Sequence, residues 1–317
     1  MLWSQSDLVK ATAGDLIGDW RNDGIAGVSI DSRSIKSDEL FVAVKAKRDG
    51  HNFINDAIRL GAKGALVDHI PADIPSNTPL LLVPSVQEAL ENLGKYRREK
   101  SQAKLVAITG SVGKTSSKNM LKTILELQGK THASPASFNN YLGVPLTLAN
   151  LPIDAAYAVV EIGMNKPGEI EPLARMAAAD VVLITAIGKA HLEAFGDIAG
   201  IAHEKAQIVK GLKSRGIAVL NADTPGYEIL KKQTIKNGSQ FISFGEMGSN
   251  LRAKKMQKLN GRIKVQCQFN DRNLEFIVGS SGFHFAENSL GVLLCADCLG
   301  ADIEKADDNG YTALILA

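Results

Sequence analysis

A glycine-rich loop with a lysine and three hydroxyl residues carries the clearest chemistry in this sequence. It follows the apolar run 105–109, predicted as a strand, and leads into a helix predicted from about Lys114. Glycines let backbone amides wrap around phosphate groups, and the amides at a helix start add positive potential. The Lys114 amine can neutralise phosphate charge, and the Thr115 hydroxyl can bind Mg²⁺. The predicted phosphate-binding residues are Gly110, Ser111, Val112, Gly113, Lys114, Thr115 and Ser116.

The spacing of this loop differs from the common phosphate-binding pattern G-x-x-x-x-G-K-[ST]. That pattern would place its first glycine at Ile108, whereas the glycine here is Gly110. A glycine-rich turn with a chance Lys-Thr pair is therefore the alternative interpretation. The agreement of strand, loop and helix favours phosphate binding.

Two further polar side chains stand where predicted strands end. Glu161 closes an apolar strand at about 155–162, and His191 follows the strand predicted at 181–187. Open α/β sheets bind ligands at the carboxyl edge of their strands. A carboxylate, a hydroxyl and an imidazole suit a divalent metal near phosphates, although histidine is an unusual ligand for Mg²⁺. We therefore predict metal binding by Thr115, Glu161 and His191; a surface charge and a loop hydrogen bond are the alternatives for the last two.

The elements that must position these residues indicate an α/β fold. Apolar strands alternate with helices from about residue 104, which predicts a mostly parallel sheet flanked by helices on both faces. Residues 1–102 mix short strands and helices and predict a small mixed α/β N-terminal domain. The P-loop domain is expected over residues 103–300, with strands and turns at about 249–278, and a tail over 301–317.

Composition excludes several classes of protein. The 317 residues include 36 Lys and Arg and 34 Asp and Glu, which gives a net charge of +2. A charge this small predicts no extended electrostatic binding of nucleic acid. No run of about 18 apolar residues exists, so we expect no membrane insertion, and the start shows no signal peptide. Three cysteines are too few for a disulfide framework, which favours the reducing cytoplasm. Cys295 and Cys298 are expected as core thiols.

In combination, these motifs resemble the Mur ligases, a family of ATP-dependent enzymes of peptidoglycan synthesis. The resemblance covers roughly residues 25–305. Within the family, TGSVGKTSSK at 109–118 and EIGMNKPGEI at 161–170 favour the member that adds D-alanyl-D-alanine. The other matching stretches are Asp31-Ser32-Arg33, Leu40-Phe41-Val42-Ala43, Asp49-Gly50-His51, FNNYLGVPLTL at 138–148, Ala190-His191-Leu192-Glu193, Phe195-Gly196, Leu220-Asn221-Ala222-Asp223, and Gly282-Phe283-His284 with Asn288.

The resemblance implies a ligase that joins D-alanyl-D-alanine to UDP-N-acetylmuramoyl-tripeptide, with ATP and Mg²⁺. ATP would phosphorylate the terminal carboxylate to an acyl phosphate, which the incoming amine then attacks. The reaction supplies peptidoglycan precursors for cell-wall biogenesis, and hence for cell shape and division. By the same resemblance we expect a monomer.

Residue roles follow from the same resemblance. Asp31, Ser32 and Arg33 would hold the UDP-sugar. Asn139 and Asn140 would line the phosphate and substrate region. Asn288 would contact adenine. The catalytic group would comprise Lys114, Glu161, His191 near a second metal, and Lys205.

Lys205 matches the lysine that the family carbamylates. Carbamylation needs a neutral amine, so burial or nearby positive charge must favour loss of its proton. A solvated helical lysine is the alternative.

The chain departs from the family pattern near its end. Mur ligases carry a C-terminal domain, and the sequence after about residue 307 does not resemble it. We therefore expect a truncated or atypical tail and the loss of a hinged closure that completes the site. A catalytically impaired protein that binds nucleotide or UDP-sugar, and a different P-loop NTPase, are the alternative functions.

Overall fold

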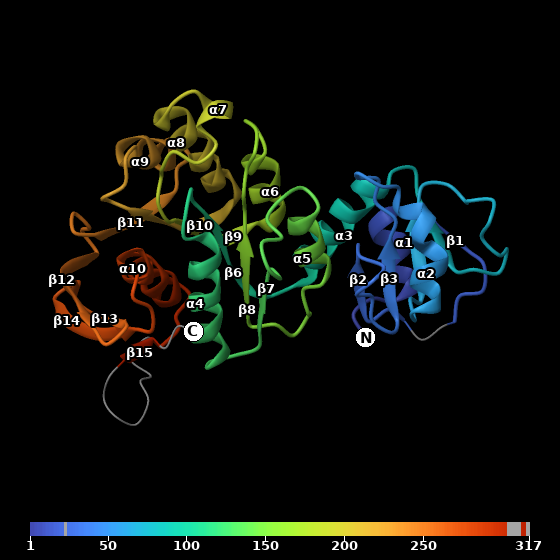
Figure 1. Ribbon diagram of the computed structural model, residues 1–317, viewed down its shortest axis with the longest axis horizontal. Helices are drawn as coiled ribbons and strands as arrows, with labels where there is room; N and C mark the ends of the chain where they lie inside the picture. Colours follow the sequence, from blue (N-terminus) through green and yellow to red (C-terminus); the bar gives the residue numbers. More distant parts are fainter. Residues whose placement is uncertain (22–23, 303–311, 315–317) are drawn as a thin grey trace. The chain divides into compact units, whose positions relative to one another are not determined.

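The computed structural model describes residues 1–21, 24–302 and 312–314 (Figure 1). Most of the predicted tail, 303–311 and 315–317, lies outside the described residues. The chain forms two compact units, the first of Met1–Ser101 with Pro145–Ile153, the second of Gln102–Val144 with Asp154–Ala317.

The segment Pro145–Ile153 packs with the first unit, although it falls inside the range 103–300 expected for the second domain. The Asn150 side chain explains this placement. Its Nδ2 donates to Val28 O at 2.8 Å, and its Oδ1 accepts from Val28 N at 2.9 Å. The side chain therefore completes the hydrogen bonding of an edge strand, as a neighbouring strand would.

The first unit contains a five-stranded sheet in the order β1-β5-β4-β3-β2, parallel except for β1 against β5. Every residue of β4 is buried. This burial matches the continuous apolar run that the sequence shows there. The elements are α1 Gln5–Thr12, β1 Asp15–Ile17, β2 Gly27–Ser29, β3 Glu39–Val42, η1 Gly50–Phe53, α2 Ile54–Arg59, β4 Gly64–Val67, β5 Leu80–Leu82 and α3 Val86–Lys100.

The second unit contains a ten-stranded sheet in the order β15-β14-β13-β12-β11-β10-β9-β6-β8-β7. Strands β6 to β12 pair in parallel, whereas β12, β13 and β14 form an antiparallel meander. The strands are β6 Lys104–Thr109, β7 Thr131–Ala133, β8 Tyr157–Glu161, β9 Ala179–Ile184, β10 Leu212–Asn221, β11 Gln240–Gly245, β12 Leu251–Leu259, β13 Arg262–Phe269, β14 Arg272–Val278 and β15 Thr312–Leu314.

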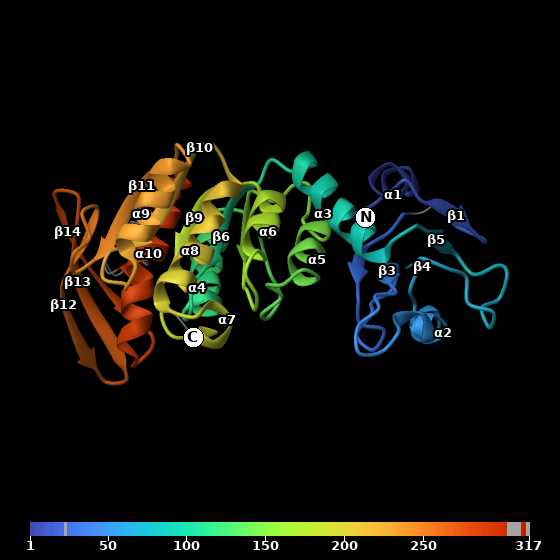
Figure 2. The same cartoon turned by 90° about the horizontal axis from the view of Figure 1, so that it is seen from above.

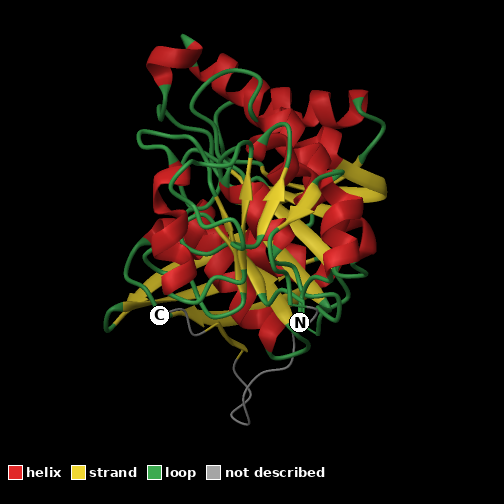
Figure 3. Cartoon of the chain, turned by 90° about the vertical axis from the view of Figure 1, so that its right-hand side faces the viewer, coloured by secondary structure: helices red, strands yellow, loops and turns green. Residues whose placement is uncertain are grey.

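Helices cover both faces of the parallel part of this sheet (Figures 2 and 3). Val106 and Ile108 of β6 join the core beneath α4 and α10, while the alternate residues Leu105 and Ala107 are also fully buried. The fold-class prediction is therefore confirmed. The helices of the second unit are α4 Lys114–Glu126, α6 Ile170–Ala177, α7 Leu192–Phe195, α8 Ile198–Ala206, η2 Gln207–Gly211, α9 Tyr227–Lys236 and α10 Phe283–Cys298. Helix α5, Gly143–Ala149, belongs mostly to the segment Pro145–Ile153 of the first unit.

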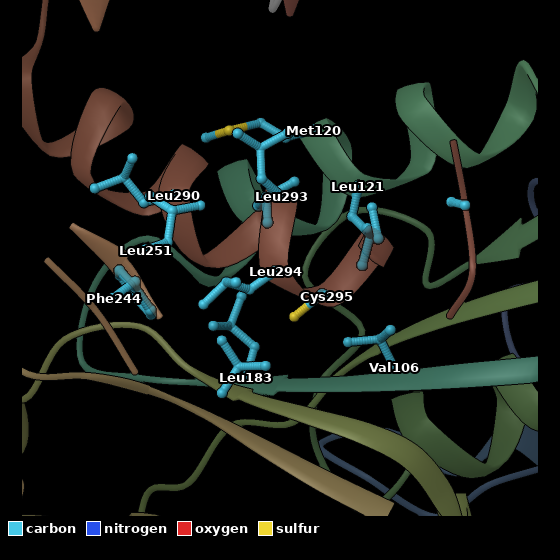
Figure 4. Close-up of a cluster of buried hydrophobic side chains, with 14 of the residues drawn as sticks. Val106, Met120, Leu121, Leu183, Phe244, Leu251, Leu290, Leu293, Leu294 and Cys295 are labelled. Carbon is cyan, nitrogen blue, oxygen red and sulfur yellow. The ribbon is translucent and has the colours of Figure 1, made fainter. Parts of the chain in front are cut away.

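Helix α10 provides much of the core of the second unit (Figure 4). Its Leu290, Leu293 and Leu294 pack among residues of α4 and of the sheet, and Cys295 lies with them. All three cysteines are free thiols, and burial raises the pKa of Cys295 well above its ordinary value. The interpretation of Cys295 as a core thiol is confirmed.

The turn predicted at Asn260-Gly261 joins β12 and β13. Both residues have positive φ, +44° and +79°, the conformation of a tight two-residue hairpin. Among the described helices, none has the length and apolar character needed to cross a membrane.

Candidate functional site

The glycine-rich loop joins β6 to α4 at the centre of the parallel sheet. β6 lies between β8 and β9, so the chain leaves β6 toward one side of the sheet and later returns to the other. Such a switch point leaves a crevice at the carboxyl ends of the strands, where open α/β sheets bind ligands. The loop, Glu161 at the end of β8 and the segment after β9 all belong to this edge.

Residues that follow β9 hold the loop in place. Thr185 Oγ1 donates to Val112 O at 2.6 Å, and Ser111 N donates to Ala186 O at 2.7 Å. Ser111 Oγ also accepts from Gly188 N at 2.9 Å. The segment that follows β9 therefore holds the backbone of the loop in place through these hydrogen bonds.

The two loop glycines are required by close neighbours. Gly110 and Gly113 have φ of +156° and +85°. A Cβ at Gly110 would lie 1.9 Å from Thr185 Oγ1, and one at Gly113 would lie 2.2 Å from Asn288 Nδ2. Asn288, buried on α10, is thus brought against the loop by the missing side chain at Gly113.

We expect Gly113→Ala to lower the free energy of unfolding by about 2–4 kcal/mol. Left-handed φ costs a non-glycine residue about 1–3 kcal/mol, and displacement of the buried Asn288 amide adds to it. Gly238→Ala is the matched control, because Gly238 has φ of +73° but nothing within 4 Å of its would-be Cβ. Urea unfolding of both variants checks the prediction, and equal losses would contradict the role of Asn288.

The Lys114 side chain folds back over the loop. Its Nζ donates to Gly110 O at 2.9 Å. Burial lowers the pKa of Lys114, and the opposing charge of Glu161 partly offsets this effect. In the described part of the chain this half-buried ammonium has one carbonyl partner, so it keeps donors for an anion in the crevice.

Glu161 is the centre of a small polar cluster. The residue is 1% exposed, and its Oε2 accepts from Thr115 Oγ1 at 2.9 Å while its Oε1 accepts from Asn139 Nδ2 at 2.8 Å. Among the described residues, no salt bridge neutralises this carboxylate. The structure therefore brings together the predicted ligands Thr115 and Glu161, and adds Asn139 to them.

Lys118 is a member of this region that sequence reasoning missed. It is 3% exposed, and its Nζ donates to Ser134 O at 2.8 Å and to Ala136 O at 2.5 Å. Ser134 Oγ in turn accepts from Glu161 N at 3.1 Å. Lys118 thus braces the segment that leads to Asn139. Lys118 lies one helical turn after Lys114, and this spacing could have indicated that the two side chains share a helix face.

Two of the predicted site residues, His191 and Asn140, have surroundings different from those of the Glu161 cluster. His191 is exposed at the start of α7 with φ of +65°, and in the described part of the chain no hydrogen bond joins it to Glu161 or Thr115. Asn140 Oδ1 accepts from Leu142 N and Gly143 N at 3.1 and 2.9 Å. Its carbonyl oxygen therefore caps the start of α5, and any substrate contact falls to its remaining atoms.

Lys205 on α8 is 1% exposed. Burial first, and then the positive charge of Lys114, lower its pKa to about 7, against the opposite pull of Glu204. The expected neutral amine thus has a physical basis in the structure. Glu204 itself accepts from Gly168 N and Ile170 N, at 2.9 and 3.1 Å, and so fixes the start of α6.

Asp31, Ser32 and Arg33 form the turn after β2 in the first unit. Arg33 Nε and Nη2 each donate to the Asp31 carboxylate at 2.9 Å. The hydrogen bond from Arg33 is the main cause that lowers the pKa of Asp31. Because the Arg33 side chain is 80% exposed, its guanidinium also faces solvent.

Comparisons with known proteins agree with this geometry. The model of the Mur ligase middle domain matches residues 108–296. A UDP-N-acetylmuramoyl-tripeptide–D-alanyl-D-alanine ligase of Rickettsia prowazekii is 38% identical over 283 residues, which are 87% of this chain and 62% of the relative. The chain thus spans less than two thirds of that relative's length.

Solved structures extend the similarity to three dimensions. A crystal structure of MurF from Acinetobacter baumannii has a TM-score of 0.85 at 31% identity, covering 95% of this chain and 66% of that one. The MurF ligase of Thermotoga maritima in complex with ADP has a TM-score of 0.72 at 28% identity, covering 87% and 64%. The family model matches more than half of the sequence, so the chain belongs to the Mur ligase family.

Proposed function

We propose that this chain takes part in the ATP-dependent ligation of D-alanyl-D-alanine to UDP-N-acetylmuramoyl-tripeptide, a step of peptidoglycan precursor synthesis. The contact between Thr115 and Glu161 beside the glycine-rich loop is the observation that carries the proposal. The name of the Rickettsia prowazekii relative supports the choice of substrates.

The Glu161 cluster fits a Mg²⁺ ion. Mg²⁺ prefers oxygen ligands, and the cluster offers the Thr115 hydroxyl and the Glu161 carboxylate. This buried carboxylate accepts hydrogen bonds from a neutral hydroxyl and a neutral amide. Lys114 and Lys118 act on it by charge, but among the described residues neither forms a salt bridge with it, so a bound cation would be favoured there. When bound, Mg²⁺ would supply charge neutralisation for phosphate oxygens. Asn139 would hold the Glu161 carboxylate in the orientation for binding it.

The ATP phosphates would lie against Gly110–Ser116. The amides in the first turn of α4 have no intrahelical acceptors and point toward the loop. Lys114 would leave Gly110 O and neutralise charge on the transferred phosphoryl group. Since Asn288 lies against Gly113, its amide side chain would stand beside the phosphates, on the path expected toward adenine.

Lys205 is proposed to carry a carbamate. With its pKa lowered to about 7, a large share of the amine is neutral near neutral pH and can attack CO₂. The product is an anion in the neighbourhood of Lys114. His191 is proposed to approach a second metal.

The reaction itself is activation of a carboxylate. Phosphoryl transfer from ATP to the terminal carboxylate gives an acyl phosphate, whose leaving group is phosphate rather than oxide. The D-alanyl-D-alanine amine then attacks and phosphate leaves. The protein contributes position and charge neutralisation. Asp31, Ser32 and Arg33 are proposed to hold the UDP-sugar, and Asn139 and Asn140 to border the reacting groups.

A phosphate-release assay with each substrate omitted in turn tests the proposal. We expect release that requires ATP, UDP-N-acetylmuramoyl-tripeptide and D-alanyl-D-alanine together, and formation of the amide product by mass spectrometry. Hydrolysis of ATP that is independent of the UDP-sugar would instead indicate a simple NTPase. Stabilisation by nucleotide without any release would indicate a binding protein.

A further inference from the structure

The first unit contains a compact cluster of histidines and carboxylates away from the glycine-rich loop. Asp49 and His51 lie at η1, which follows β3, and Asp68 and His69 directly follow β4. β3 and β4 pair in parallel, so the segments after them lie at the same sheet edge. One donor atom each of His51, Asp68 and His69 lies within 4.8 Å of the other two.

His51 is oriented by its neighbours. The side chain is 2% exposed, and its Nδ1 lies 2.6 Å from Asp49 Oδ1. Its Nε2 accepts from Asp68 N at a long 3.3 Å. These contacts suit the tautomer that carries the proton on Nδ1 and the lone pair on Nε2. A carboxylate that orients a histidine in this way is a common outer partner in metal sites.

The same Nε2 also faces Asp68 Oδ1 at 3.3 Å. A nitrogen lone pair and a carboxylate oxygen repel each other unless a proton or a cation lies between them. His69 approaches the same oxygen, with its Nδ1 2.6 Å from Asp68 Oδ1. The two imidazole rings are stacked with centroids 4.2 Å apart, and one nitrogen of each ring lies within 3.3 Å of the same carboxylate oxygen.

We propose that His51 Nε2, Asp68 Oδ1 and His69 Nδ1 form a binding site for Zn²⁺ or a similar late first-row divalent ion. Two imidazoles and one carboxylate are ligands that such ions prefer, whereas Mg²⁺ favours oxygen ligands. Three protein ligands leave a fourth position for water or another ligand.

The distances from Asp68 Oδ1 to the two imidazole nitrogens can be compared with those of a zinc site. Zinc bonds of about 2.0–2.2 Å place tetrahedral ligands roughly 3.3 Å apart. His51 Nε2 and Asp68 Oδ1 already have this separation, and His69 Nδ1 must withdraw from 2.6 Å. The ion must also replace the long contact from Asp68 N, because Nε2 has one lone pair. The His69 side chain is 50% exposed and has room to do so.

Lys45 competes with the ion. Its Nζ lies 3.1 Å from both oxygens of Asp68 and supplies the cation that this carboxylate has in the structure. The Lys45 side chain is 54% exposed, so it can swing into solvent when a divalent ion replaces it. A site of this kind gains affinity when the competing lysine is removed, which a purely structural cluster does not predict.

Co²⁺ titration of the untagged, chelator-treated chain tests the proposal. Co²⁺ with few ligands including nitrogen gives intense visible d–d bands, and the oxygen ligands at Thr115 and Glu161 give only weak ones. We expect saturable bands in the wild type that Zn²⁺ abolishes by competition. His69→Ala should weaken Co²⁺ binding at least about 10-fold, since it removes a ligand. Lys45→Met should strengthen it several-fold.

Two controls keep the result interpretable. His203→Ala removes an exposed histidine of α8 and should leave Co²⁺ affinity unchanged. Thermal unfolding in chelator reports whether each variant folds, and Zn²⁺ should raise the melting temperature of the wild type but not of His69→Ala. Absence of the bands in the wild type, equal affinity in folded His69→Ala, or weaker binding by Lys45→Met would each overturn the proposal.

Discussion

Glu161→Gln is expected to reduce phosphate release by about 100- to 1000-fold and to raise the Mg²⁺ concentration needed for half-maximal release. The substitution removes the charge but keeps the shape. Thr115 and Asn139 retain hydrogen-bonding partners in the glutamine amide, so the cluster stays folded. Loss of one preorganised group that stabilises charge typically costs this much in rate.

The Mg²⁺ dependence separates a metal-binding role from a structural one. Glu228→Gln is the matched control, because Glu228 is exposed on α9 in the same unit. It should leave release and its Mg²⁺ dependence unchanged. If Glu161→Gln lowered the rate with the Mg²⁺ dependence of the wild type, the cluster would not hold the metal.

Two residues of the crevice could be predicted from the sequence because Glu161 stands at the end of an apolar strand and Thr115 belongs to the glycine-rich segment that follows another. Thr115 and Glu161 meet because β6 and β8 pair directly, with Ile108 beside Glu161 in the register. Neighbouring parallel strands bring such ends together whatever the loops between them do. The apolar runs were visible, so the proximity of these two side chains could be predicted from the pattern, while their metal-binding role stays a prediction.

The contacts made by residues in loops could not be predicted from the sequence pattern. The contact of Asn139 with Glu161 and the bonds of Lys118 depend on how the segment 134–139 folds back on the sheet. The three-residue strand β7 is too short for periodicity to show. Likewise, the packing of Pro145–Ile153 with the first unit depends on hydrogen bonds across more than 100 residues. The role of His191 stays a prediction.

Lys205→Met should have opposite effects on stability and on activity. The folded state lowers the pKa of Lys205 from 10.5 to about 7, so the unfolded chain binds more protons between these values. Wild-type stability must therefore rise with pH across this window, and the full penalty of the buried charge applies below about pH 7. Methionine removes that penalty. We expect a gain on the order of 3 kcal/mol at pH 6.5 that shrinks toward pH 9.5.

Urea unfolding in CO₂-free buffer at the two pH values measures this gain. Lys232→Met, on the exposed face of α9, is the control and should show no such pH dependence. A gain for Lys205→Met that is equal at both pH values would contradict the buried charge. In the ligase assay the same variant should lose phosphate release, and bicarbonate should not restore it. A protein that becomes more stable and less active at once has not lost activity through misfolding, so the lost group must serve the reaction.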